Sequence, residues 1–331
     1  MSKVDVLRRI VAGTLQHRKK TVDAANRQIK LLEEQNKLLK SLVQTQNSLA
    51  QTEKKRDEVI AKLHWEAQRT RTIAENIRGA VMAPIRQDIA EVMQAKQLDH
   101  LETLAVIRDE RKSFARFGDG EFRLMYRREH KLKFHKNSPE LMTALKSVLV
   151  SPHPDTLLGM PQVFLGLHWS IVFAETWHFV GPLVATQERF GNSHVTRPAM
   201  FDEYGQDAVE AWRSVWAGRD AAVITGEGSR FDLIDPLFGS LRSSTEFFSK
   251  PTDAFDDLPR LVDQVVSSGL DLALLSLGPA ATVAADMLAA RGVQALDIGH
   301  LSASYLNVLE GAALPEEMPT ARRVAAESTA K

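Results

Sequence analysis

The chain has 331 residues, of which 44% are hydrophobic and 25% are charged, and its formal net charge at pH 7 is zero. This length allows one substantial domain and a second element. Cysteine is absent, which excludes disulfides, thiolate metal sites and a cysteine nucleophile. The sequence contains no apolar run of about 18 residues and no signal-peptide pattern at its N-terminus, so we expect a cytoplasmic protein.

Basic residues are concentrated towards the N-terminus. Residues 1–100 carry 19 Lys and Arg against 12 Asp and Glu, and six of the basic residues lie within residues 1–20. A solvated helix face is the simpler interpretation of such a segment. The alternative is peripheral contact with the inner face of the cell membrane or with a polysaccharide-assembly partner. No nucleic-acid partner is predicted.

Residues 19–78 predict a long helix, because they contain no proline or glycine and are rich in Gln, Lys, Glu, Leu and Ala. Apolar residues recur three and four positions apart, and polar residues occupy some of the positions between them. The apolar set is Leu31, Leu38, Leu42, Leu49, Val59 and Leu63, and the polar set is Gln35, Thr45, Thr52 and Arg56. This imperfect heptad predicts a modest coiled coil and a homo-oligomer. A single exposed helix, with pairs such as Glu33 and Lys37, is the alternative.

The chain is expected to change character near residue 100. Gly79 and Pro84 interrupt the long helix in this prediction, and apolar periodicity over residues 85–111 indicates a connecting helix. We therefore divide the chain into a helical oligomerisation or tethering region, a catalytic domain and a flexible tail. Their predicted ranges are 1–100, 101–312 and 313–331.

Two carboxylates follow a β-prone run that starts at Ser113. The run leads into Gly118, Asp119, Gly120 and Glu121, and the two glycines allow the chain to turn sharply around Asp119. Whether this segment stays extended or turns, Asp119 and Glu121 can reach one side of it and share an ion. Carboxylate oxygens suit Mg²⁺ or Mn²⁺. An Asp- and Gly-rich surface turn is the alternative for the triplet taken alone.

Helices and strands are predicted to alternate after this motif. Helices are expected from residue 122, over 139–150 with Ser138 as cap, and over 204–216, and strands over 157–161 and 221–225. Residues 163–190 have helical spacing up to a break at Gly181 and Pro182. The aromatic and histidine side chains of that segment are interpreted as core rather than as an acceptor-binding platform. They are His168, Trp169, Trp177 and His178.

Two further segments place polar groups in a loop or at the end of a strand. Asn192 and Arg197 lie in a polar loop that can hold an anion. The strand over 221–225 leads into Glu227, Ser229 and Arg230, at the edge of an α/β sheet where ligands bind.

The clearest unit is a strand over 272–277, a glycine turn and a helix to about residue 290, and a second strand over 293–298. Free N–H groups at the start of that helix are the natural site for phosphate, and His300 follows the second strand at the same edge. Neither a full G-x-G-x-x-G nor a Walker A sequence is present.

Residues 113–311 resemble the bacterial GT-D-fold glycosyltransferases. The resemblance rests on separated motifs in the right order: residues 115–122, Asn192 with residues 197–198, residues 226–230, residues 277–283 and residues 295–300. It implies a Rossmann-like α/β domain, here preceded by a long α-helical coiled coil. It also implies a nucleotide diphosphate-sugar donor, of UDP type, and a glycan or glycoconjugate acceptor. Asp119 and Glu121 occupy the family's Asp-x-Glu motif for Mn²⁺ or Mg²⁺, and His300 is implied as a further metal ligand or diphosphate contact.

This chain departs from the family pattern at two places. Ala280 stands where the family usually has Thr, which removes a hydroxyl from the phosphate turn but leaves Thr282. Ser302 and Ser304 stand where acidic residues are usual. Either difference can alter acceptor specificity or abolish activity.

The function predicted from the sequence is metal-assisted glycosyl transfer. Asp119, Glu121 and His300 hold the cation, and Glu227 is the candidate base for the acceptor hydroxyl. The predicted donor contacts are Arg116, Gly118, Asn192, Arg197, Ser229, Arg230, Gly278, Pro279, Ala280 and Thr282. One alternative is a non-catalytic coiled-coil scaffold with a degenerate nucleotide- or glycan-binding domain. Another is a metal-dependent sugar-phosphate hydrolase.

Overall fold

A computed structural model describes residues 3–132, 136–162 and 166–317. It divides into two compact units, residues 1–77 and 78–331. The boundary therefore lies earlier than the predicted one at residue 100. The larger part of the predicted tail, residues 318–331, lies outside the described residues.

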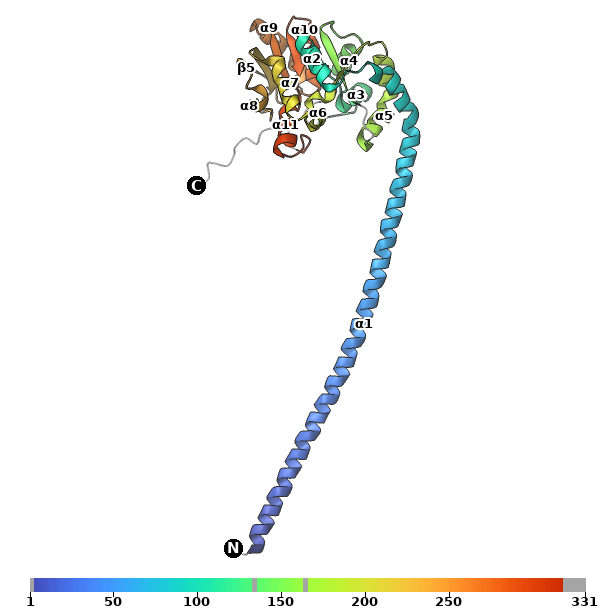
Figure 1. Ribbon diagram of the computed structural model, residues 1–331, viewed down its shortest axis with the longest axis vertical. Coiled ribbons are helices and arrows are strands. Elements are labelled where there is room, and N and C mark those ends of the chain that lie inside the picture. The colour runs from blue at the N-terminus through green and yellow to red at the C-terminus, as the bar shows by residue number, and fades with distance from the viewer. Residues whose placement is uncertain (1–2, 133–135, 163–165, 318–331) are drawn as a thin grey trace. The chain divides into compact units, whose positions relative to one another are not determined.

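The first unit consists of the long helix α1 (Lys3–Val92), which continues into the second unit (Figure 1). The predicted interruption at Gly79 and Pro84 was wrong, because α1 runs through both residues. Pro84 removes one backbone hydrogen bond, but the turns around it are held by tertiary packing. Met82 and Ile89 are buried there in the core of the second unit. The predicted connecting helix is likewise divided, into the end of α1 and α2 (His100–Asp109).

The second unit is built on a parallel sheet in the order β3-β2-β1-β7-β6-β4-β5. Its strands are β1 (Ser113–Arg116), β2 (Thr156–Met160), β3 (Gly191–Asn192), β4 (Asp220–Gly226), β5 (Ser243–Ser249), β6 (Leu272–Ser276) and β7 (Gln294–Asp297). The helices that follow α2 are α3 (Asp119–Tyr126), α4 (Pro139–Val150), α5 (Leu167–Val184), α6 (Pro198–Tyr204), α7 (Gln206–Trp216), α8 (Asp235–Phe238), α9 (Leu258–Ser267), α10 (Pro279–Ala289) and α11 (Leu301–Glu310).

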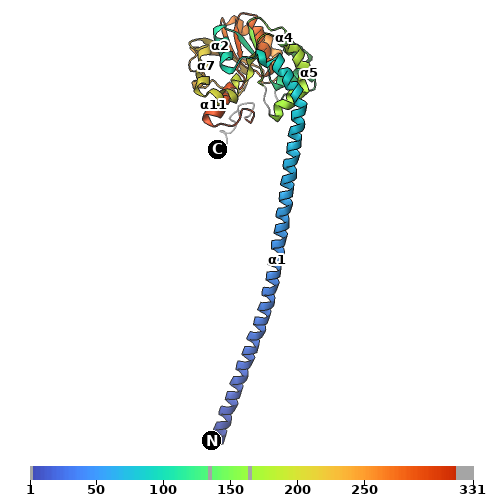
Figure 2. The same cartoon turned by 45° about the vertical axis from the view of Figure 1, so that its right-hand side comes forward.

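Helices cover both faces of the sheet, so alternate strand residues enter two separate cores. On β6, Ala273 and Leu275 pack in one core while Leu272 and Leu274 pack in the other. The first core is completed by the end of α1 and by α3, α4, α5, α9 and α10, and the second by α2, α6, α7, α8 and α11. Figure 2 shows α7 and α11 on one side of this unit and α4 and α5 on the other. This is the predicted α/β, Rossmann-like class preceded by a long helix.

Local signals located most of the elements, and the differences have local causes. The helix expected over 204–216 is α7, which begins two residues later than predicted, because Gly205, with a φ of +50°, separates it from α6. The break expected at Gly181 and Pro182 is absent, since α5 continues to Val184. Residues 163–165 of that predicted segment lie outside the described residues.

Candidate functional site

A cavity of about 1090 Å³ opens along the carboxyl edge of the sheet, which is where parallel α/β sheets bind ligands. Segments that follow five strands supply much of its lining: residues 116–121, 226–232, 249–254 and 276–279, with residues of the stretch 297–303. Eleven of the fourteen predicted site residues line it. They are Arg116, Gly118, Asp119, Glu121, Arg197, Glu227, Ser229, Arg230, Gly278, Pro279 and His300.

The Asp-Gly-Glu triplet is the first turn of α3, not an extended segment or an open turn. On a helix, side chains two positions apart point in different directions. Asp119 is half-buried, and its Oδ2 lies 3.3 Å from Nε2 of His168 and 3.4 Å from Nη1 of Arg123. Glu121 folds back instead, so that its Oε2 accepts a 2.9 Å hydrogen bond from the N–H of Gly118. Burial, with the charges of Asp297 and Asp119 adding to it, raises the pKa of Glu121 to about 7.

Asp119, Glu121 and His300 do not form a complete cation site, and a divalent cation fits here as an ion shared between the protein and a bound anion. Within residues 3–132, 136–162 and 166–317, no group of three His, Asp or Glu side chains is arranged to hold a metal. The predicted set of Asp119, Glu121 and His300 is therefore not a preassembled three-ligand site. Mg²⁺ usually takes one or two protein carboxylates and completes its shell with water and substrate phosphate. Both Asp119 and Glu121 line the cavity, but Oε2 of Glu121 is bonded to the N–H of Gly118, so Asp119 is the carboxylate that fits this requirement as it stands and Glu121 offers its remaining oxygen.

Arg116 lines the cavity and is anchored in a buried ion pair. Its Nη2 lies 2.8 Å from Oδ1 of Asp297, and its Nε donates to the Asp297 carbonyl at 2.9 Å. A third bond runs from Nη1 to Oγ1 of Thr196 at 2.6 Å. The guanidinium lies against Gly299, where an added Cβ would come 2.0 Å from Nη2, so this position requires glycine.

Two further arginines converge on the same space. Burial, with the nearby charge of Arg116 adding to it, lowers the pKa of Arg197 to about 10, and burial also lowers the pKa of Arg230. Arg197 pairs with Glu316, which itself lines the cavity. Within the described chain, three guanidinium groups thus gather in one cavity that seven carboxylates also line, and Asp297 and Glu316 pair with Arg116 and Arg197. The positive charge that can attract an anion is therefore local to the arginine cluster.

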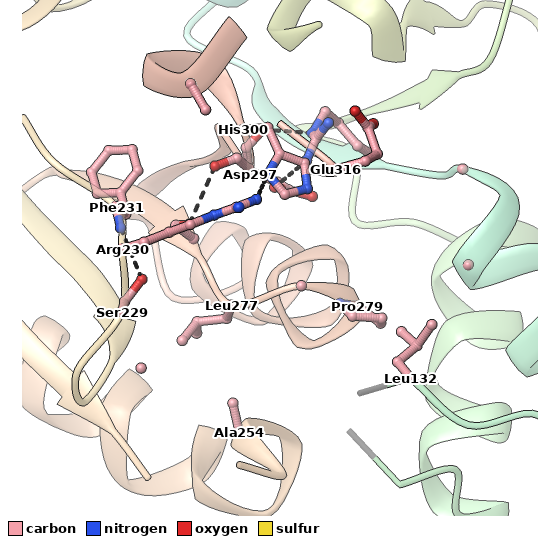
Figure 3. A pocket seen from close by; sticks show the side chains of 18 of the residues that line it. Leu132, Ser229, Arg230, Phe231, Ala254, Leu277, Pro279, Asp297, His300 and Glu316 are labelled. Carbon is pink, nitrogen blue, oxygen red and sulfur yellow. Dashed lines mark hydrogen bonds and ion pairs between the residues drawn. The ribbon is translucent and has the colours of Figure 1, made fainter. Parts of the chain in front are cut away.

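His300 lies beside this cluster as a neutral imidazole. Burial and the nearby arginines lower its pKa to about 3. Its Nδ1 is 3.1 Å from Nη2 of Arg230, and Figure 3 shows the two side chains pointing toward each other. Because arginine can only donate, Nδ1 accepts and Nε2 carries the proton. That tautomer suits a hydrogen bond to a phosphate oxygen better than ligation of a metal.

The turn between β6 and α10 presents the start of a helix to the cavity. Gly278 has a φ of +58°, and Pro279 occupies the first turn of α10, as predicted. Both line the cavity, so the partial positive charge of this helix end faces the arginine cluster.

Three predicted substrate contacts lie outside the lining, because their side chains are used within the fold. Ala280 is fully buried in the first core. Thr282 is buried, and its hydroxyl donates to the carbonyl of Arg116 at 2.7 Å. Asn192 caps the short 3₁₀ helix Ser193–Thr196 by accepting a 2.9 Å bond from the N–H of His194.

Ser302 and Ser304, which depart from the family pattern, also have structural partners. The Ser302 hydroxyl donates to the carbonyl of Asp232 at 2.6 Å, and the Ser304 hydroxyl donates to the carbonyl of Thr196 at 3.0 Å. They tie α11 to two loops that line the cavity.

Several lining residues escaped the sequence prediction. His168 and Trp169, interpreted as core, line the cavity, whereas Trp177 is buried and donates to Asp88 of α1 at 2.6 Å. His194 and Glu316 also line it. No local pattern marks these positions, because only the tertiary fold brings them to the strand ends.

His194 should make stability fall in acid. It is buried, its Nδ1 accepts a 3.2 Å bond from the N–H of Gln162, and burial lowers its pKa from 6.5 to about 3. Between pH 6.5 and about 3 only the unfolded chain takes up this proton, so stability is lost as the pH falls through that range. From pH 7.5 to 4.5, the loss attributable to His194 is about 2–3 kcal/mol. Urea unfolding at both pH values should show that the difference in unfolding free energy between wild type and His194→Gln changes by this amount. A difference that is the same at both pH values would contradict the prediction.

An open parallel sheet with helices on both faces and an arginine-lined cavity at its carboxyl edge defines an α/β domain of Rossmann-like type. More narrowly, the chain belongs to the glycosyltransferase GT-D fold family, which matches residues 114–326. Two solved structures share the fold. The first is a structure of the highly conserved domain of unknown function 1792, which is described as having a distinct glycosyltransferase fold. It superimposes with a TM-score of 0.60 at 23% sequence identity, and the match covers 69% of this chain and 86% of the solved chain. The other, described as a new glycosyltransferase from Streptococcus sanguinis, has a TM-score of 0.58 at 24% identity, with coverages of 66% and 85%.

Two curated relatives are similar in sequence. The glycosyltransferase GlyD of Streptococcus pneumoniae serotype 4 is 26% identical over 228 residues, which is 65% of this chain and 28% of the relative. The probable glycosyl transferase Gly of Streptococcus gordonii is 27% identical over 229 residues, which is 65% of this chain and 33% of the relative. The match thus spans about a third or less of each relative's length.

Proposed function

We propose that this chain is a glycosyltransferase that moves a sugar from a nucleotide diphosphate-sugar, of UDP type, to a hydroxyl of a glycan or glycoconjugate. The observation that carries the proposal is the convergence of Arg116, Arg197 and Arg230 with the start of α10 in one cavity of about 1090 Å³. Fixed positive charge of this kind matches the diphosphate of such a donor. Membership of the glycosyltransferase GT-D fold family supports the same conclusion.

The same groups supply the chemistry that transfer requires. As the bond between the anomeric carbon and the diphosphate oxygen breaks, negative charge grows on the leaving diphosphate. Arg230 and the positive end of α10 stabilise that charge from positions that the fold holds, and Arg197 joins them once Glu316 has been displaced. The Nε2–H of His300 donates to the same diphosphate.

The acceptor hydroxyl must lose its proton as the new bond to the anomeric carbon forms. We assign this proton to Glu227, an exposed carboxylate on the segment after β4 that lines the cavity. We assign Mn²⁺ or Mg²⁺ to Asp119 and Glu121. When bound, the cation neutralises charge on the diphosphate.

A donor must displace Glu316 to reach Arg197, since the carboxylate of Glu316 pairs with that guanidinium inside the cavity. Carboxylate is the weaker partner here, because a diphosphate offers more charge and more oxygens. Glu316 thus lies where the donor phosphates are expected.

One observation favours a second candidate, a scaffold that binds nucleotide or glycan without transfer. Ser302 and Ser304 replace the usual acidic residues, and both hydroxyls are engaged by backbone carbonyls. If those acids are essential for transfer, this chain retains the donor cavity and lacks turnover.

We further propose a cytoplasmic location, self-association through α1, and peripheral contact of the basic residues within 1–20 with a membrane or an assembly partner. No helix within the described part of the chain is long and apolar enough to cross a membrane.

The proposal is tested by titration calorimetry of the full chain with UDP, with and without Mn²⁺. We expect binding that Mn²⁺ strengthens by about a hundredfold, or about 2.8 kcal/mol. Screening UDP-sugars against acceptors then follows, with UDP release as the readout. Binding without transfer would favour the scaffold, and release of inorganic phosphate would indicate a hydrolase. Failure to bind UDP, GDP or dTDP would overturn the proposal.

A further inference from the structure

The first unit carries an apolar stripe that nothing in the described chain covers. Residues 31–77 of α1 are all exposed. Fourteen positions spaced alternately four and three apart run from Leu31 to Ile77, and eight of them are apolar. Those eight are Leu31, Leu38, Leu42, Leu49, Val59, Leu63, Ile73 and Ile77, with exposed fractions between 50% and 65%. These fourteen positions are called the seam below. Their spacing is that of a coiled-coil interface.

The seam is more apolar than its sequence suggests, because three of its polar residues satisfy their hydroxyl groups within the helix. Thr45, Thr52 and Thr70 donate to the carbonyls of Ser41, Ser48 and Glu66 at 3.0, 2.9 and 2.8 Å. Each hydroxyl is thereby bonded to its own backbone, which leaves the threonine methyl group to pack against a partner. Only Gln35, Arg56 and Glu66 then interrupt the seam.

Charge favours a second copy of this chain as the partner. Residues 31–77 contain eight Lys and Arg against seven Asp and Glu, so two copies repel each other little. The same near-neutral composition gives an anionic membrane no particular attraction. Arg56, the basic seam residue, is about two-thirds exposed and lies 3.4 Å from Asp57 of its own helix. A long side chain held in this way can keep its charge in water beside an interface.

We propose that residues 31–77 of two copies form a parallel, in-register coiled coil about 70 Å long. In this arrangement every seam residue meets its own copy. The leucines form unmixed apolar layers, and Gln35 can hydrogen-bond to Gln35. Arg56 and Glu66 each face a like charge, which their long side chains can keep in water at the edge of the interface. An antiparallel alignment about the centre of the stretch places Gln35 opposite Ile73 and Glu66 opposite Leu42, which buries polar groups against apolar ones. The second units of both copies therefore follow the same end of the coiled coil.

This proposal does not rest on the glycosyltransferase assignment, and it is tested first by mass. Light scattering of the full chain should give twice the chain mass of 36.9 kDa. Leu42→Glu with Leu49→Glu should weaken the dimer by at least about a hundredfold. The matched control, Gln44→Glu with Gln51→Glu, introduces the same charges in the same stretch but off the seam, and should remain dimeric. A monomeric wild-type chain, or two pairs of variants that behave alike, would overturn the proposal.

Orientation is tested by cross-linking, which the absence of native cysteine makes unambiguous. Leu42→Cys lies on the seam and should form a disulfide-linked dimer on mild oxidation, since identical residues meet only in a parallel, in-register pair. Asn47→Cys lies on the opposite face of the helix and should cross-link at least about tenfold more slowly. A dimer by mass in which Leu42→Cys does not cross-link faster than Asn47→Cys would contradict the parallel register.

Discussion

Replacing Arg116 with methionine should lower the free energy of unfolding of the second unit by about 3–5 kcal/mol. The substitution leaves the carboxylate of Asp297, whose side chain is only 5% exposed, without its charged partner. It also removes the bonds to the Asp297 carbonyl and to Thr196. Urea unfolding followed by near-ultraviolet circular dichroism measures the loss, because this signal reports packing of the aromatic core.

A double-mutant cycle separates this charge effect from lost packing. Asp297→Leu combined with Arg116→Met replaces both charges by apolar groups, and should recover most of the stability that Arg116→Met loses. The recovery is expected because an unpaired buried charge, rather than the missing bond, dominates the loss in the single variant. Additive effects of the two substitutions would contradict a coupled ion pair.

The sheet was predictable where local signals agree with one another. The unit from β6 to β7 has a short buried apolar run, a proline in the first turn of α10 and a glycine with a φ of +77° after that helix. Each signal specifies the same element boundary, so propensity, capping and burial give one answer. β5 lacked such a signal, because it is an edge strand whose residues are mostly exposed and which pairs only with β4.

The sequence predicted which segments form the candidate site, but it predicted less well which of their side chains face the cavity. Strand ends identified the edge that binds ligands, which is why Arg230, Gly278 and His300 were found. Sequence cannot tell whether a polar residue beside such an edge faces the cavity or the fold. Thr282 and Asn192 face the fold, where each satisfies a backbone group that burial would otherwise leave unpaired.

The Asp-Gly-Glu triplet illustrates the same limit. Its glycines suggested a turn in which both carboxylates share one side, but Gly118 is the residue before the first turn of α3. The helix separates the two side chains by direction, so that Asp119 contacts His168 while Glu121 bonds to the N–H of Gly118. A capping interaction of this kind is visible in sequence only once the helix start is known.

Because the two carboxylates point in different directions, replacing Asp119 with asparagine should abolish metal-dependent donor binding. Asp119 is the carboxylate that faces the cavity without a backbone bond, so its loss should remove the whole gain of about a hundredfold expected from Mn²⁺. Glu121→Gln should remove about tenfold, or about 1.4 kcal/mol. The glutamine oxygen can still accept from the N–H of Gly118, and this variant therefore keeps the cap.

Calorimetry with UDP provides its own control for both variants, because Arg116, Arg230 and the start of α10 have no hydrogen bond to either carboxylate within the described chain. Affinity for UDP without Mn²⁺ should be no lower than that of wild type, since each variant removes a negative charge beside the arginines, and the increment on adding Mn²⁺ should fall. Sugar transfer from the donor should be lost together with that increment. An undiminished Mn²⁺ increment in Asp119→Asn would contradict its role as a ligand. Full turnover in the double alanine variant, Asp119→Ala with Glu121→Ala, would overturn metal-assisted transfer at this site.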